Sequence, residues 1–252
     1  MKVRILTMAI LVVCLAALPA AADWDHPVKW DQLDPGSYGA LSYINSESEA
    51  LTADDFPCTE TGWITDIEFD GLALSDPANI DALRITFWSD VPATSEEESH
   101  PGTLLKDLSV GPADPNDPLR LGFQQIDVNR YKVDLPRDSW LEQKEGEIYW
   151  IGIQGVMSND DIFGWVFRNI DANTWGDDAA FTGTDYAPWW HWGWDDAGAP
   201  QLYQGTLPST LVKSADMSFK LTGIPIPEPG VFALAGLGLF ALLRRRRTTT
   251  GR

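Results

Sequence analysis

The segment Trp63-Ile64-Thr65-Asp66-Ile67-Glu68-Phe69-Asp70 shows the pattern that decides the fold. Its apolar residues Ile67 and Phe69 alternate with acidic residues on either side. Because successive side chains of a β-strand point to opposite faces of the sheet, this alternation is typical of a strand with one buried and one solvated face. We therefore predict a half-buried strand here.

Further segments with strand patterns recur along most of the chain. They cover residues 83–89, 121–128, 131–135, 147–156, 162–169 and 217–222. Runs rich in Asp, Asn, Pro and Ser, such as residues 75–77 and 158–161, lie between them and favour tight turns. Only residues 138–143 look helical, and strands do not alternate with helices. The pattern predicts an all-β fold, an antiparallel β-sandwich of the jelly-roll type.

The N-terminus has the composition of a secretory signal peptide. Lys2 and Arg4 precede an apolar run over residues 5–18, and a row of alanines ends at Ala22, directly before Asp23. Positive charge, apolar run and small residues in this order predict export and cleavage between Ala22 and Asp23.

The last 28 residues contain a second targeting pattern. An apolar run over residues 231–243 would form a helix about 20 Å long, short of the ~30 Å hydrocarbon core, so we predict a short transmembrane helix. The arginines after it favour a cytoplasmic C-terminus and place the preceding domain outside. The expected sorting residues are Pro227, Glu228, Pro229, Arg244, Arg245, Arg246 and Arg247.

This order of Pro-Glu-Pro triplet, short apolar helix and arginine cluster resembles the PEP-CTERM sorting signal of Gram-negative bacteria. The resemblance implies that the export machinery and an exosortase-type transpeptidase are partners, and that cleavage occurs near the triplet. It also implies delivery to the cell envelope, cell surface or extracellular matrix of a Gram-negative bacterium, with transient membrane anchoring. The alternative is an ordinary single-pass tail anchor.

These patterns divide the chain into a signal peptide (1–22), a β-sandwich domain (23–223), a Pro-rich spacer (224–230), an apolar helix (231–243) and a basic tail (244–252). The domain is similar to a family of uncharacterised secreted bacterial domains. The similarity is carried by residues 54–67, 89–92, 101–102, 146–150 and 163–165. It spans about residues 29–223 and implies the sandwich fold and an extracellular location. No activity is known for this family.

The part between the two terminal signals is strongly acidic. It keeps 36 of the 37 acidic residues but only 11 of the 18 basic ones, for a formal charge near −25. Such a field repels nucleic acid, so no nucleic-acid partner is expected, whereas cations and neutral ligands are compatible with it. Once the signal peptide is removed, Cys58 is the one remaining cysteine. It cannot form an internal disulfide, and we predict a small buried apolar residue.

Twelve tryptophans lie in the exported part, and four of them fall in the hexapeptide Trp189-Trp190-His191-Trp192-Gly193-Trp194. Indole faces stack on sugar rings, and neighbouring carboxylates accept hydroxyl protons. In a strand, Trp190, Trp192 and Trp194 would share one face, with Trp189 and His191 on the other. We predict a polysaccharide-binding site at Trp189, Trp190, Trp192, Trp194 and Asp195. The alternatives are a loop here, or rings that pack in the core.

Motifs of common enzymes are missing: the sequence has no Gly-x-Ser-x-Gly, His-Glu-x-x-His, phosphate-binding glycine loop or Cys-x-x-Cys. We therefore expect a non-enzymatic surface or matrix protein without a cofactor. Two rival hypotheses are a polysaccharide-processing glycoside hydrolase acting through two carboxyl groups, and a purely structural matrix component. Acidic pairs such as Asp160-Asp161 and Asp195-Asp196 leave a structural calcium ion open as an alternative. The sequence leaves the oligomeric state open.

Overall fold

The computed structural model describes residues 26–114, 116, 121–171, 178–183 and 186–226. In this part the regular structure consists of strands and two short 3₁₀ turns, η1 (Pro77–Asn79) and η2 (Arg137–Ser139). The strands are β1 (Val28–Asp31), β2 (Pro35–Leu41), β3 (Tyr43–Ile44), β4 (Glu49–Pro57), β5 (Gly62–Ala73), β6 (Ile80–Val91), β7 (His100–Val110), β8 (Gly122–Gln125), β9 (Arg130–Asp134), β10 (Leu141–Gln143), β11 (Ile148–Met157), β12 (Phe163–Arg168), β13 (Ala180–Gly183), β14 (Tyr186–Asp195), β15 (Pro200–Tyr203), β16 (Leu211–Ser214) and β17 (Phe219–Pro225).

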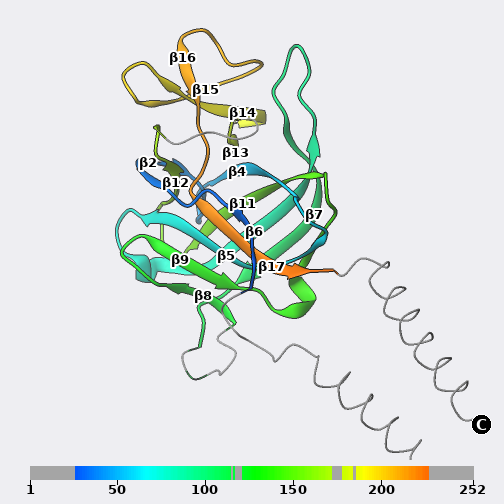
Figure 1. Ribbon diagram of the computed structural model, residues 1–252. Helices are drawn as coiled ribbons and strands as arrows, with labels where there is room; N and C mark the ends of the chain where they lie inside the picture. Colours follow the sequence, from blue (N-terminus) through cyan, green and yellow to red (C-terminus); the bar gives the residue numbers. More distant parts are fainter. Residues whose placement is uncertain (1–25, 115, 117–120, 172–177, 184–185, 227–252) are drawn as a thin grey trace, which may run out of the picture.

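The strands form two sheets (Figure 1). The eight-stranded sheet has the order β1-β17-β5-β12-β2, with β9 and β10 also on β5 and β8 on β9. The nine-stranded sheet has the order β15-β14-β13-β4-β3-β11-β6-β7, with β16 on β14 and β4 also on β11. Strand pairs are antiparallel apart from β3 with β11. The predicted all-β fold is confirmed, and the jelly-roll type stays a prediction.

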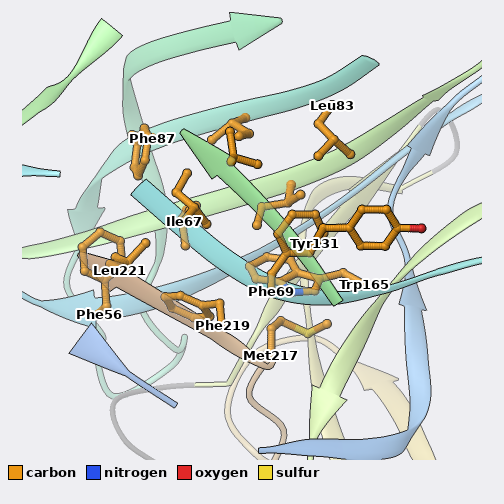
Figure 2. Packing of buried hydrophobic residues seen from close by; sticks show 14 of the residues in the cluster. Phe56, Ile67, Phe69, Leu83, Phe87, Tyr131, Trp165, Met217, Phe219 and Leu221 are labelled. Atoms are coloured by element: carbon orange, nitrogen blue, oxygen red, sulfur yellow. The ribbon is translucent and has the colours of Figure 1, made fainter. Parts of the chain in front are cut away.

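The main core lies between the two sheets (Figure 2). Ile67 and Phe69 of β5 are fully buried, which confirms the alternation in the segment that predicted this strand. Phe69 stacks on Tyr131 of β9 with ring centroids 5.4 Å apart. Phe87 of β6 enters the same cluster from the nine-stranded sheet. The segments predicted as strands all overlap strands of the structure.

The prediction of helix at residues 138–143 is wrong. A single 3₁₀ turn, η2, is followed at once by β10, which pairs with β5 through Leu141 opposite Ile64. Leu141 and Gln143 are buried while Glu142 between them is exposed. This two-residue period fits a strand, and a six-residue window was too short to separate it from a helical pattern.

The last strand also runs further than predicted. β17 continues beyond Gly223 to Pro225, and the segment expected as a spacer therefore begins inside the sheet. The predicted apolar helix at 231–243 lies outside the described residues. Among the residues that are described, no helix has the length and apolarity required to cross a membrane.

Candidate functional site

A second apolar cluster lies on the nine-stranded sheet, on the face turned away from the main core. Trp150 of β11 is fully buried there against Ala53 and Ala180, and Trp88 and Trp189 pack on it as half-buried rings. Phe87 precedes Trp88 and Ile151 follows Trp150, and both belong to the main core, so the indoles of Trp88 and Trp150 point to the opposite face. On β14, Trp194 belongs to the main core, so Trp189 also lies on the opposite face. We call Trp88, Trp150 and Trp189 the tryptophan cluster.

The sheet is curved around this cluster. Trp88 is on β6 and Trp189 on β14, and the pairs β6–β11, β11–β4, β4–β13 and β13–β14 separate them. Four strand spacings amount to about 19 Å in a flat sheet. The two ring centroids are nevertheless 6.0 Å apart, with the rings nearly perpendicular at 84°. The face that carries the tryptophan cluster is therefore concave.

Two turns from opposite ends of the sheet meet as a consequence of this curvature. The turn between β6 and β7 rises beside β14, β15 and β16 (Figure 1). The backbone N–H of Glu98 donates to the carbonyl of Gly205 at 3.3 Å, and the N–H of Leu207 donates to the Glu98 carboxylate at 2.9 Å. These bonds hold the two ends of the curved sheet together.

Polar groups accompany the rings on the concave face. The indole N–H of Trp150 donates to Asp90 Oδ1 at 2.8 Å. Asp55 lies opposite Trp150 in the register of β4 with β11 and is 2% exposed. Nε1 of Trp88 is buried and has no acceptor among the described residues. A buried donor left in this state costs roughly 1–3 kcal/mol.

The hexapeptide that suggested a binding site forms part of strand β14, so the strand alternative holds and the loop alternative does not. Trp192 and Trp194 contact Phe167 of the main core, with ring centroids 5.3 and 5.4 Å away. Trp194 is 3% exposed and is closed to a ligand. Trp190 is half-buried and lies opposite Phe181. Of the predicted rings, Trp189 is the one in the tryptophan cluster, and binding at these residues stays a prediction.

Asp195, the fifth predicted ligand residue, has a local structural role. Its Oδ1 accepts hydrogen bonds from the backbone N–H groups of Ala197 and Ala199 at 3.0 and 2.8 Å. Its Oδ2 accepts from the Gln201 amide at 3.3 Å. The carboxylate therefore closes the turn between β14 and β15.

The carboxylates of the acidic loops that suggested calcium also accept hydrogen bonds from nearby residues. Asp161 accepts hydrogen bonds from Ser75 and Asn79, and Asp160 accepts one from Ser46. Within the described ranges, no three His, Cys, Asp or Glu side chains meet in an arrangement that could hold a metal ion. The loop carboxylates link turns to one another through these hydrogen bonds. Among the described residues they do not form a coordinating set for a calcium ion.

A pair of adjacent carboxyl groups occurs on the eight-stranded sheet, and the sequence analysis missed it. Asp66 and Asp134 are opposite each other on β5 and β9. Burial raises the pKa of Asp134 to about 7, and its contact with Asp66 adds to this shift. Burial also disfavours ionised Asp66, but hydrogen bonds from Asp134, Thr65 and His26 outweigh it and lower the pKa of Asp66.

Two more buried carboxyl groups connect distant segments. Asp54 accepts hydrogen bonds from Gln32 Nε2 at 2.6 Å and from the backbone N–H of Met217 at 2.8 Å. Burial, together with neighbouring carboxyl groups, raises the pKa of Asp54 well above its usual range. Asp178 accepts hydrogen bonds from the hydroxyls of Tyr203 and Ser214, and burial raises its pKa to about 6. Their partners are far apart in sequence, so no local motif could reveal them.

The single cysteine of the exported part is buried, as predicted. Cys58 is 4% exposed and belongs to the main core. Its thiol donates to the carbonyl of Glu60 at 3.2 Å, and burial raises its pKa. A raised pKa leaves little thiolate, which is the nucleophilic form.

Two family profiles match the chain. A profile described as a domain of unknown function (DUF7901) matches residues 28–222, and the PEP-CTERM protein-sorting motif matches residues 225–247. No curated protein matches the chain. The predicted sorting residues from Pro227 to Arg247 and the signal cleavage site at Ala22 and Asp23 lie outside the described residues. The boundary between the two matches falls at the end of β17.

Proposed function

The chain belongs to the DUF7901 family of domains of unknown function, and we propose that it is a non-enzymatic envelope protein that binds neutral extracellular polysaccharide. Its sorting motif implies export to the bacterial cell envelope and processing by exosortase-type machinery. The proposal adds a Gram-negative cell surface or matrix as the destination. It also adds transient anchoring by the apolar run at 231–243.

The observation that carries polysaccharide binding is the pair Trp88 and Trp189 on the concave face of the nine-stranded sheet. Both rings are half-buried, so part of each indole remains open to solvent. An indole face stacks on the C–H groups of a pyranose ring, and its N–H donates to a hydroxyl. The carboxylate of Asp90, which accepts the indole N–H of Trp150, lies next to these rings and places an acceptor there.

The charge of the domain supports a neutral rather than an anionic polymer. With a formal charge near −25 between the two terminal signals, the domain repels uronic-acid or sulfated chains over several ångströms at physiological salt. A neutral glucan has no such penalty. The weak affinity expected from one or two stacked rings becomes useful when many copies bind the same polymer.

Retention on immobilised polysaccharide tests this proposal. Processed protein recovered from producing cells is passed over a neutral glucan and over alginate, an anionic polymer. We expect retention on the glucan, none on alginate, and a clear loss of retention for Trp189→Ala.

The matched control is Trp140→Ala. Trp140 is another half-buried tryptophan, held by the carbonyl of Leu135 at 3.0 Å on the other sheet. This variant should be retained like the parent. Equal retention of Trp189→Ala and parent would remove the site, and no retention of the parent on any neutral glucan would favour a purely structural role.

A further inference from the structure

The end of the domain is paired with the sheet up to the start of the sorting motif. On β17, Ile224 lies opposite Trp63 and Pro225 opposite Gly62. Beyond the strand, the backbone N–H of Ile226 donates to the carbonyl of Thr61 at 3.0 Å. The sorting-motif match begins at Pro225, and the Pro-Glu-Pro triplet begins directly after Ile226. No free linker separates the folded domain from the triplet.

Two glycines make this close pairing of β17 with β5 possible. A Cβ atom on Gly62 would lie 2.4 Å from the carbonyl oxygen of Ile224, and one on Gly223 would lie 1.9 Å from that of Trp63. Distances under 3.0 Å to backbone atoms force one strand to move. Lys29 covers the same spot, because its ammonium donates to the carbonyl of Glu60 at 2.9 Å and lies next to the Gly62 position.

A transpeptidase binds its substrate as an extended chain and needs the backbone on both sides of the bond that it cleaves. Residues Ile224, Pro225 and Ile226 precede the triplet, and one edge of their backbone is occupied by β5 and Thr61. The folded domain would therefore hinder the access of a membrane-bound enzyme to the cleavage site. Local opening of a strand end has a low free-energy cost compared with global unfolding, so this end can detach on its own.

We infer that the segment Gly223 to Ile226 is a closed latch, and that the processing transpeptidase acts on the fraction of molecules in which this latch has detached from β5. The processing rate then equals the intrinsic rate multiplied by the open fraction. Breaking one backbone hydrogen bond of the latch changes the opening equilibrium by roughly fivefold. This inference rests on the processing that the sorting motif implies and is independent of polysaccharide binding.

The test measures how fast the C-terminal segment is removed from the full chain, by pulse labelling in cells that contain the transpeptidase. Gly62→Ala lies more than 160 residues before the triplet, leaves the sorting signal unchanged and pushes against the Ile224 carbonyl. We expect removal to be about fivefold faster. The matched control is Gly111→Ala, because a Cβ there meets no atom within 4 Å. It should be processed like the parent.

A second variant protects the test against misfolding of Gly62→Ala. Eight Gly/Ser residues inserted between Ile226 and Pro227 leave the latch closed but move the triplet away from it. This variant should also be processed faster, whereas the same insertion between the exposed residues Ser209 and Thr210 should change nothing. Unchanged removal in the spacer variant would overturn the inference, and so would slower removal, which would show that the domain surface takes part in recognition. No removal from the parent would instead overturn the sorting assignment.

Discussion

Asp66 and Asp134 face each other across β5 and β9, and the two carboxyl groups differ in pKa: that of Asp134 is raised and that of Asp66 is lowered. Asp66 Oδ2 accepts hydrogen bonds from His26, Thr65 and Thr222 at 2.9, 2.5 and 3.0 Å. Asp134 is 9% exposed, and its carboxyl group has Lys132 Nζ at 3.5 Å. Below about pH 7 the ionised member is therefore Asp66, which holds the donors, and the protonated member is Asp134, whose pKa is raised to about 7. A proton on Asp134 removes the repulsion between two neighbouring carboxylates.

Asp134→Asn should flatten the pH dependence of stability. The folded protein keeps the Asp134 proton up to about pH 7, while the unfolded chain loses it near pH 3.8. The free energy of unfolding therefore falls as pH rises between these values, by at most about 1.4 kcal/mol per pH unit before solvent screening. Asparagine does not ionise, so the variant should lose this slope between pH 5 and 7 and exceed the parent in stability at pH 8.

Urea unfolding at several pH values measures this slope. The exposed Asp138→Asn serves as control and should keep the parent profile. The opposite contribution of Asp66, whose pKa is lowered, is present above the unfolded pKa and is lost below about pH 4, so it does not enter the measured window. An Asp134→Asn profile as steep as that of the parent would contradict the raised pKa of Asp134.

Trp150→Phe should destabilise the domain while leaving the main core intact. Trp150 fills the concave face under Trp88 and Trp189, and its N–H donates to Asp90. The smaller ring leaves a void and removes that bond, so we expect a loss of about 1–3 kcal/mol. Denaturant unfolding should show a lower midpoint with an unchanged slope. A loss no larger than that of the matched variant Trp140→Phe would mean that the cluster does not hold the curved sheet together.

Cys58 should be unreactive in the folded protein. Its thiol lies in the main core and its pKa is raised by burial, so both access and thiolate are lacking. A thiol reagent at pH 8 should label the chain in denaturant and leave the native domain unlabelled. Rapid stoichiometric labelling of the native protein would show that this part of the core opens readily.

Local patterns in the sequence predicted the strands whose two faces differ most in polarity. Ile67 and Phe69 alternate with acidic residues, and their strand is present as predicted. β4 was not predicted because its residues are buried on both faces, including Asp54 and Asp55, so the sequence Ala-Asp-Asp-Phe shows no polar face. A pattern that assigns every charged residue to the solvent-exposed face fails where a charged residue is buried against partners that are distant in sequence.

The candidate site was predicted in part, and the missing part depends on long-range geometry. Clustering in sequence singled out Trp189, but its neighbours in space, Trp88 and Trp150, are 101 and 39 positions away. Pairing of β6 with β11 places Trp88 opposite Trp150, and the curvature of the sheet brings Trp189 to them. The period-two rule placed Trp190, Trp192 and Trp194 on one face, but it could not tell that this face is the main core. Contact with Phe167 decides that point.

Asp54 provides the sharpest contrast between two substitutions. Burial and the neighbouring carboxyl groups raise its pKa well above the usual range, which favours the neutral form in the folded protein, and its Oδ2 accepts from Gln32 and from the N–H of Met217. Asp54→Asn keeps an acceptor oxygen and avoids the cost of burying a charge, so we expect stability at pH 7 within about 1 kcal/mol of the parent or above it. Asp54→Ala leaves two buried donors without an acceptor and should cost about 2–5 kcal/mol.

The same pair of variants also reports on the protonation state of Asp54. If the carboxyl group is neutral in the folded protein, the free energy of unfolding of the parent should rise relative to that of Asp54→Asn as pH falls from 7 to 5. The reason is that Asp54 of the unfolded chain is ionised throughout this range. The difference in the free energy of unfolding between parent and Asp54→Asn is therefore the quantity to measure at both pH values. A difference that stays constant, together with a large loss for Asp54→Asn at pH 7, would mean that Asp54 is buried as a charged carboxylate.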